Sequence, residues 1–368
     1  MNNNFLLKLF LIFFVAFYEM PHGLALNFVF TRATNTTQND YNTALPSVTA
    51  ASQLWTSRFT DNVTVNLTIG FTGLGQNILA QAGSSYGLYN YNSQVRPSLL
   101  LDATSSIDAS VNSHLQLGSV GMLLNRNSNN PNGSGSGVPY FDNDADDNNN
   151  LIRMTTANAK ALGLLASNNS TADADITFSN AFSYDFDQSN GITPGQFDLT
   201  GVFAHEIGHA LGFTSGVDIL DGNSPPINGP FLDSQFTFVS TADLFRFSTQ
   251  SRALGDGVID WTADTRDKYF SLDGGATKLV SYSTGINFGD GQQASHWKDN
   301  LGIGIMDPTA APGELLTVSD NDVKLFDAIG WDTTVTSIPE PGTYLFWAAA
   351  LCFGSLALRK KTTLRIKP

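Results

Sequence analysis

The 368-residue chain is poor in cysteine, histidine, glutamate and basic residues, and the shortages of cysteine and of basic residues each exclude a kind of site or partner. Its one cysteine, Cys352, lies in an apolar stretch near the C-terminus, so the rest of the chain has no disulfide and no thiolate for a metal. Any metal must therefore be bound by His, Asp or Glu. Lys and Arg total 19 against 33 acidic residues, a net charge of -14, whereas phosphate contacts need clustered basic residues. This balance excludes nucleic acid as a partner.

The first 25 residues have the composition of a secretory signal peptide. One Lys precedes an apolar run from Leu9 to Phe17, and Gly23 and Ala25 are small residues that suit cleavage by signal peptidase. The run is shorter than the roughly 20 residues that a membrane-spanning helix needs, so a signal is favoured over an anchor. The mature chain is expected to begin near Leu26.

The last segment, 333–368, contains Pro-Glu-Pro, then an apolar stretch from Tyr344 to Leu358, then Arg359, Lys360 and Lys361. This order resembles the PEP-CTERM sorting signal of bacterial exported proteins, which an exosortase processes. An ordinary tail anchor is the alternative. Both imply a short transmembrane helix that anchors the protein, transiently for the sorting signal. Both also place the main body in the cell envelope, on the surface or outside the cell, because positive residues stay inside.

Between these ends, helical and strand patterns alternate, which predicts one large unit over 26–332. Strands are expected over 26–31, 62–71 and 173–187, and helices over 46–59, 96–115 and 155–165. Pro46 falls in the first turn of its helix, where proline is tolerated. A hairpin is expected over 267–282 around Asp273-Gly274-Gly275, and a loop over 126–150.

The segment "DNDADD" within that loop offers oxygen ligands at Asp142, Asp144 and Asp146, which could attract Ca²⁺. It is not an EF-hand, because the sixth position is Asp147 rather than Gly and the twelfth is Arg153 rather than Glu. A solvated acidic loop is the favoured interpretation.

The stretch "FDLTGVFAHEIGHALGF" predicts a metal-binding helix. Asp198 or Thr200 caps its start and Gly212 ends it. His205 and His209, four residues apart, lie on one face of the helix and both imidazoles point the same way. Glu206 is one of only four glutamates in the chain, against 29 aspartates. Its place beside the first histidine suits a general base for water.

"HEIGHALGF" resembles the zinc-binding helix of the metzincins. In their common pattern, the third ligand lies where this chain has Ser215, which is a poor zinc ligand. Asp218 is one nearby candidate, but it lies three residues beyond that position, which would change the loop that presents the ligand. His296 in "ASHWKDNLGIGIMDP" is the better one, because leishmanolysin-like metzincins carry an "HW" pair shortly before the Met-turn, here Met306. Three of the four histidines beyond the signal peptide then belong to one site, and His114 remains a surface residue.

The resemblance implies a zincin/metzincin-like α+β fold. A twisted mixed sheet would lie behind the active-site helix, and a smaller C-terminal subdomain would bear the Met-turn, with Met306 as support under the site. The catalytic domain would divide into an N-terminal part, 26–212, and a C-terminal part, 213–332, closed by a helix that Ser319 or Asp320 caps. A peptide substrate would add to the sheet edge, expected at 173–187.

The activity that the resemblance implies is that of an exported zinc-dependent endopeptidase. One catalytic Zn²⁺ would be bound by His205, His209 and His296, with Glu206 as general base. A non-catalytic surface or matrix binding protein on the same scaffold is the alternative from another class, and a zinc hydrolase of non-peptide bonds is a third. Retention of Glu206 with all three histidines disfavours a decayed, non-catalytic site.

Overall fold

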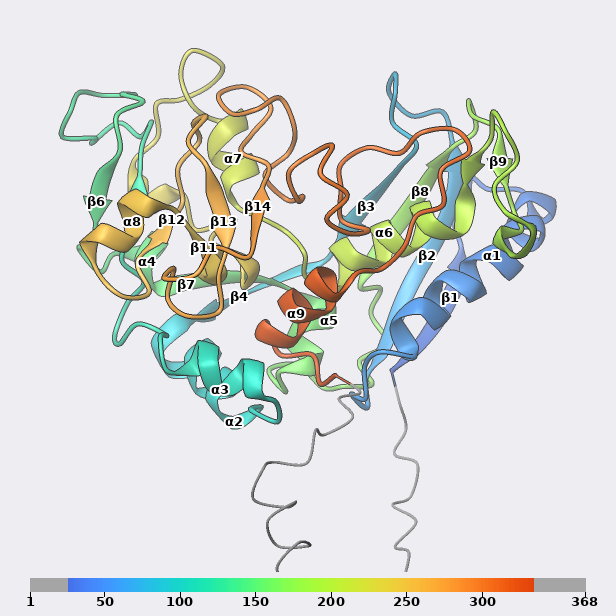
Figure 1. Ribbon diagram of the computed structural model, residues 1–368, viewed down its shortest axis with the longest axis horizontal. Coiled ribbons are helices and arrows are strands. Elements are labelled where there is room, and N and C mark those ends of the chain that lie inside the picture. Colours follow the sequence, from blue (N-terminus) through green and yellow to red (C-terminus); the bar gives the residue numbers. More distant parts are fainter. Residues whose placement is uncertain (1–25, 334–368) are drawn as a thin grey trace, which may run out of the picture.

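The computed structural model describes residues 26–333, in which helices and several small sheets form a mixed α+β molecule, as expected (Figure 1). The signal peptide expected over 1–25 lies outside these residues. So does the expected sorting segment with its apolar helix, except for Thr333. Among the described helices, none combines the length and apolarity needed to cross a bilayer.

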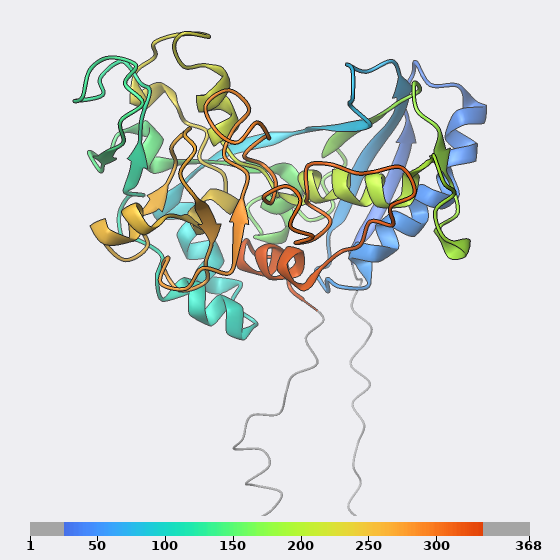
Figure 2. The same cartoon turned by 45° about the horizontal axis from the view of Figure 1, so that its top comes forward.

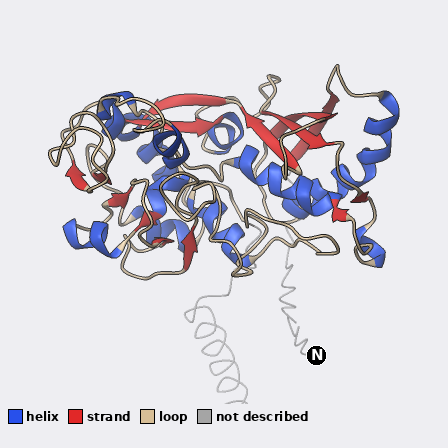
Figure 3. Ribbon diagram, turned by 90° about the horizontal axis from the view of Figure 1, so that it is seen from above, coloured by secondary structure: helices blue, strands red, loops and turns tan. Residues whose placement is uncertain are grey.

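The largest sheet lies at one end of the molecule and has the order β1-β2-β8-β3 (Figures 1 and 3). Its strands are β1 (Asn27–Arg32), β2 (Thr64–Thr72), β8 (Ala174–Ser179) and β3 (Ala80–Ser84). The first three run parallel, and β3 is antiparallel to β8. Val65, Leu67 and Ile69 of β2 are buried and alternate with less buried residues. The two strands expected at the start of the chain are thus confirmed.

The expected sheet edge is wrong. Segment 173–187 supplies β8, which lies inside the sheet between β2 and β3, and then a separate short strand, β9 (Tyr184–Asp185), that pairs with β10 (Phe197–Asp198). The edge strand next to β8 is β3, and β1 forms the opposite edge of the sheet. The sequence of β3, "AQAGS", consists mostly of small residues whose polarity alternates only weakly. Such a sequence does not predict a strand until its pairing with β8 is known.

Helix α1 (Gln38–Thr56) packs beside α6 (Leu199–Leu211). It begins eight residues before the expected start because the Thr37 side chain accepts a hydrogen bond from the Asp40 amide and caps the helix. Pro46 therefore lies inside the helix and not in its first turn. At the other end, the Trp55 indole donates to the Ala204 carbonyl at 3.0 Å, which fixes α1 to the middle of α6.

The helix expected over 96–115 is interrupted. A π turn, η1 (Tyr91–Val95), leads into α2 (Arg96–Leu101), and α3 (Ser106–Asn112) begins anew, because Ser105 and Asp108 form a capping box that stops continuation from α2. The helix expected over 155–165 is shorter, α5 (Thr156–Ala161). The expected loop 126–150 contains a strand and a helical turn, β6 (Tyr140–Asp142) and α4 (Asp147–Asn150).

Short sheets build the other end of the molecule. The expected hairpin is confirmed, since β13 and β14 pair antiparallel, with β11 beside β13. In the neighbouring sheet, β5 lies between β12 and β6, and β4 pairs with β7. The bounds of these strands are β4 (Tyr86–Asn90), β5 (Met122–Leu124), β7 (Leu151–Thr155), β11 (Arg246–Phe247), β12 (Ile259–Asp260), β13 (Lys268–Phe270) and β14 (Val280–Tyr282). The short helices are η2 (Gln188–Asn190), α7 (Val217–Gly222), η3 (Asp233–Gln235), η4 (Ala242–Phe245) and α8 (Thr249–Leu254).

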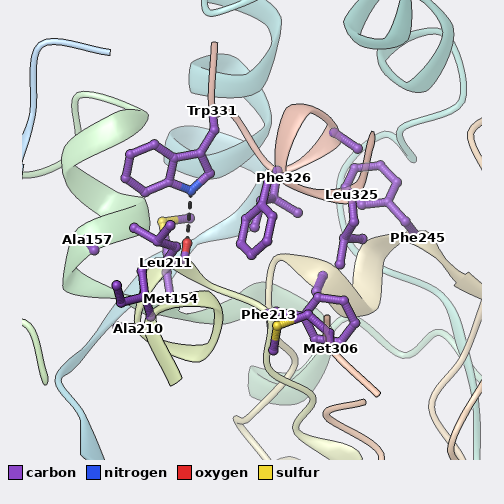
Figure 4. Packing of buried hydrophobic residues seen from close by; sticks show 14 of the residues in the cluster. Met154, Ala157, Ala210, Leu211, Phe213, Phe245, Met306, Leu325, Phe326 and Trp331 are labelled. Carbon is purple, nitrogen blue, oxygen red and sulfur yellow. Dashed lines mark hydrogen bonds between the residues drawn. The ribbon is translucent and has the colours of Figure 1, made fainter. Parts of the chain in front are cut away.

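The C-terminal helix α9 (Asp320–Ala328) closes the core from below α6, and Ser319 caps it (Figures 1 and 4). Phe326 lies beneath α6 among aromatic rings, 4.9 Å from Trp55 between centroids. The Trp331 indole donates to the Leu211 carbonyl at 2.9 Å, at the last turn of α6 (Figure 4). The end of the described chain therefore fixes the helix that carries two of the expected metal ligands.

Candidate metal centre

Local signals set both ends of α6. Asp198, rather than Thr200, is the N-cap, and its carboxylate accepts from the Gly201 amide at 2.9 Å. Gly212 ends the helix with φ of 125°, a conformation that other residues adopt only with strain. This abrupt end turns the chain away just after His209.

The structure brings together the three histidines that the sequence singled out. The Nε2 atoms of His205 and His209 are 3.1 Å apart, and each is 3.2 Å from Nε2 of His296. The three ring nitrogens thus form a nearly equilateral triangle. We call these three residues the histidine centre.

The opposite ring nitrogens fix the protonation of the histidine centre. Nδ1 of His205 faces the Ile305 carbonyl and Nδ1 of His209 faces the Phe213 carbonyl, both at 2.7 Å, while Nδ1 of His296 faces the Gln293 carbonyl at 3.3 Å. A carbonyl only accepts, so each Nδ1 carries the proton of a neutral ring. Each Nε2 is therefore a bare lone pair. Three lone pairs at these distances repel unless they share a cation.

Burial keeps the rings neutral. It lowers the pKa of all three imidazoles below the ordinary value, and that of His209 to about 3, with the neighbouring His205 adding to the effect. For His296 the other two rings act in the same direction. Neutral imidazole is the form that binds metal, so no proton has to leave before an ion enters.

The triangle fits one ion of the size of zinc. Tetrahedral zinc with nitrogen ligands at about 2.0–2.1 Å separates those nitrogens by roughly 3.4 Å, close to the 3.1–3.2 Å between the three Nε2 atoms. Three nitrogen donors leave the fourth tetrahedral position open to the cleft. The histidine centre can thus hold a metal, and its donors are of a kind that zinc prefers.

Asp218, the other nearby candidate for the third ligand, instead holds the segment that carries His296. Its carboxylate accepts from the Ala294 amide at 2.6 Å and from the Ser295 amide at 3.1 Å. The amide of Ser215, where the common pattern has a ligand, is bonded to Ser295 Oγ at 2.8 Å. Both residues therefore position the segment just before His296.

Met306 lies in a tight turn, closed by a bond from the Asp307 amide to the Gly304 carbonyl. Its sulfur packs against Gly208, one residue before His209: a Cβ at Gly208 would come within 2.3 Å of it. The same turn supplies the Ile305 carbonyl that holds His205. Met306 thus supports the helix from below, in the position expected of a structural residue.

Asp322 joins this turn to the third histidine, a role that the sequence did not reveal. One of its buried carboxylate oxygens accepts from the Trp297 indole at 2.8 Å, next to His296. The other accepts from the Ile305 amide at 2.9 Å. In the sequence, Asp322 cannot be distinguished from any other acidic residue in the first turn of a helix. No sequence pattern therefore predicts its two hydrogen bonds.

Glu206 lines the same cleft of about 810 Å³ as the three imidazoles. Its side chain is only 5% exposed, and burial raises its pKa to about 8, against a backbone hydrogen bond from Ala82 of β3. The segment after Met306 follows α6 along the cleft, with the Leu316 amide bonded to Asp198 (Figure 2). His114 lies elsewhere, partly exposed and 2.7 Å from Asp256.

Comparison of the chain with protein-family models, with curated proteins and with solved structures finds no match in any of the three. Any assignment of function therefore rests on the geometry of the histidine centre and on the motifs that carry it.

Proposed function

We propose that this protein is a zinc-dependent endopeptidase of the metzincin type, and that it acts outside the cytoplasm. The observation that carries the proposal is the convergence of three proton-free Nε2 atoms in a cleft that a buried glutamate also lines. The glycine after the second histidine and the turn around Met306 agree with the metzincin resemblance. The terminal segments, with their resemblance to export and sorting signals, support the location.

His205, His209 and His296 would hold the ion. A zinc ion there supplies a Lewis acid for the scissile carbonyl and lowers the pKa of water from near 16 to roughly 7. Glu206 accepts the proton of the attacking water at its carboxylate and returns it to the leaving amine nitrogen. The ionised carboxylate that this step needs gains stability from a cation at the histidine centre, against the effect of burial.

The edge strand β3 gives a peptide substrate a place to bind. The Leu79 carbonyl accepts from the Ser179 amide of β8, and the Ser85 amide donates to the Asp173 carbonyl. Because antiparallel pairing alternates, backbone groups of Ala80, Ala82 and Ser84 point away from β8. The Ala82 amide bonds to Glu206, so this free side faces the cleft. An extended peptide pairs with the remaining groups and passes in front of the histidine centre.

A casein or gelatin overlay with and without a zinc chelator tests the proposal. We expect clearing by the wild type, loss of clearing with chelator, and its return on addition of zinc. An active protein that hydrolyses esters but no peptide bonds would identify a different zinc hydrolase. If the zinc-loaded wild type cleaves neither esters nor peptides, the proposal is contradicted and a non-catalytic binding protein on this scaffold is the remaining interpretation.

A further inference from the structure

A second group of potential metal ligands lies at the end of β6, at the left edge of Figure 1. One carboxylate oxygen each from Asp142, Asp144 and Asp233 lie within 4.8 Å of one another. Asp142 and Asp233 are only 3% and 4% exposed, whereas Asp144 faces solvent. The sequence favoured a solvated acidic loop here, and the burial of Asp142 contradicts that. We call these three residues the carboxylate cluster.

No cation of the protein balances the carboxylate cluster within residues 26–333. The ion pairs of lysine and arginine in this range involve other carboxylates. Asp142 accepts a hydrogen bond from Asn148, but the carboxylates of Asp144 and Asp233 lie close beside it. Buried like charges at this separation are strongly unfavourable without a proton or a cation between them.

Asn148 supplies an independent sign of a ligand. Its side chain is fully buried, and its Nδ2 donates to Asp142 Oδ2 at 2.9 Å, so the amide lies against the carboxylate cluster. Among the described residues, its Oδ1 has no hydrogen-bond partner. This buried oxygen belongs to a side chain that already contacts the carboxylate cluster, and a buried acceptor without a donor indicates an ion or a water molecule that binds there.

The surroundings hold the oxygens in place. Asp233 Oδ2 accepts from Asn129 at 2.6 Å and from the Tyr140 hydroxyl at 3.0 Å. Asp146, the third acid of the sequence pattern, is not part of the carboxylate cluster: it caps α4 by accepting from the Asn148 amide at 3.2 Å. Its place is taken by Asp233, the first residue of η3, which is remote in sequence.

We propose that the carboxylate cluster, with Oδ1 of Asn148, binds one Ca²⁺ ion. All of the donors are oxygens, three of them carboxylates, which is the set that calcium prefers over zinc. Exposed Asp144 marks the entry side, where water completes the coordination. The ion links the loop after β6 to η3. It thereby stabilises the end of the molecule that consists of short strands and helices.

The test adds CaCl₂ to the zinc-loaded full-length protein and measures binding by calorimetry and the melting temperature. We expect one Ca²⁺ per chain and a rise of about 5 °C at a hundredfold excess over Kd. Asp144→Asn and Asp233→Asn should each weaken binding at least tenfold. Asp147→Asn, which makes the same charge change at an exposed position of the same loop, is the matched control and should bind as the wild type does.

Absence of binding and of stabilisation in the wild type at 10 mM CaCl₂ would overturn the proposal. Unchanged binding in Asp144→Asn would overturn it as well, and this exposed substitution decides the matter should Asp233→Asn fail to fold. An equal response to MgCl₂ would overturn the assignment to calcium. Zinc content, measured in every sample, keeps these outcomes separate from the fate of the proposed peptidase activity.

Discussion

The histidine centre and the carboxylate cluster differ in the charge that their ligands carry before an ion binds. The histidine centre is built from neutral rings, each oriented by a backbone carbonyl, and burial holds them neutral. The carboxylate cluster is built from acids, and burial drives one of them, Asp142, toward the protonated form by raising its pKa to about 7. Neutral nitrogens favour zinc, and crowded oxygens favour calcium.

Because of this difference, we expect the histidine centre to bind zinc and the carboxylate cluster to bind calcium independently of each other. Each has donors that suit one metal and disfavour the other, and the three histidines and three aspartates have no residue in common. Variants of one group should therefore leave the response of the other unchanged. The predictions that follow begin with the largest expected effect.

His296→Ala should abolish both zinc retention and peptide hydrolysis, because two imidazoles remain where three converge. Metal analysis after dialysis and a peptide cleavage assay measure the two effects. His114→Ala, at a histidine outside the centre, is the control and should keep both. The calcium-dependent rise in melting temperature should persist in His296→Ala. Loss of that rise would show that the two groups do not bind their ions independently. Full activity with bound zinc in His296→Ala would show that His296 is not a ligand.

Glu206→Gln should retain zinc and lower kcat by about 10²–10⁴-fold, the usual contribution of a general base. The amide keeps the size of the side chain but does not accept the proton of water. Steady-state cleavage of a fluorogenic peptide, together with zinc content, measures this effect. Glu314→Gln, at an exposed glutamate, should be as active as the wild type. Equal activity of Glu206→Gln and wild type would contradict the assigned role.

Asp218→Asn should weaken zinc binding by about 10–100-fold, because residues that hydrogen-bond the segment bearing a metal ligand orient that ligand. The amide accepts at one atom only, whereas the carboxylate receives three bonds from Ala294 and Ser295. Competition with a chromogenic zinc chelator gives the affinity. Asp175→Asn, an exposed position in β8, should show no change. Unaltered zinc affinity in Asp218→Asn would show that other contacts position His296.

The histidine centre could be predicted from the sequence because its signals are local. Two ligands, the base and both helix ends fall within Asp198 to Gly212, and helical spacing places the side chains without any knowledge of the sheet. The third ligand needed the motif around Met306. What the sequence could not give is Asp322, whose two bonds join segments that only the folded chain brings together.

The carboxylate cluster and the sheet edge were mispredicted for one shared reason. Asp233 approaches Asp142 across some ninety residues, and no local spacing marks such a partner. The short strand β3 likewise depends on β8 for its pairing, and its sequence of small residues alternates only weakly. Tertiary pairing therefore decided both, whereas the long periodic strands β1 and β2 were found from sequence alone.

The metal-free protein should lose stability in opposite pH directions through the two groups. The imidazoles have lowered pKa values when folded, about 3 for His209, so their contribution is full above 6.5 and falls as the pH drops toward 3. Asp142 has a raised pKa of about 7, so its contribution is present below about 4 and is lost as the pH rises through 7.

Urea unfolding of the metal-free protein between pH 4 and 9 measures these slopes. Asp142→Asn should remove a loss of stability that builds up between about pH 4 and 7, so its stability should rise more with pH over this range than that of the wild type. Glu206, with its pKa raised to about 8, acts in the same direction as Asp142, so Glu206→Gln should likewise remove a loss of stability between about pH 4.5 and 8. A smaller rise of stability between about pH 4 and 7 in Asp142→Asn than in the wild type would contradict the expected direction.

Met306→Leu should have the smallest effect, because it changes neither group of ligands. The Met306 sulfur packs under Gly208, and leucine has nearly the same volume as methionine. The substitution should therefore lower the free energy of unfolding by less than about 1.5 kcal/mol. Thermal unfolding gives this value, and zinc content should stay at one equivalent. Met122→Leu, equally buried in β5, is the control for a methionine far from α6 in sequence. Loss of zinc from Met306→Leu, with unfolding unchanged, would mean that the sulfur binds the ion and that the histidine centre is not built of nitrogen alone.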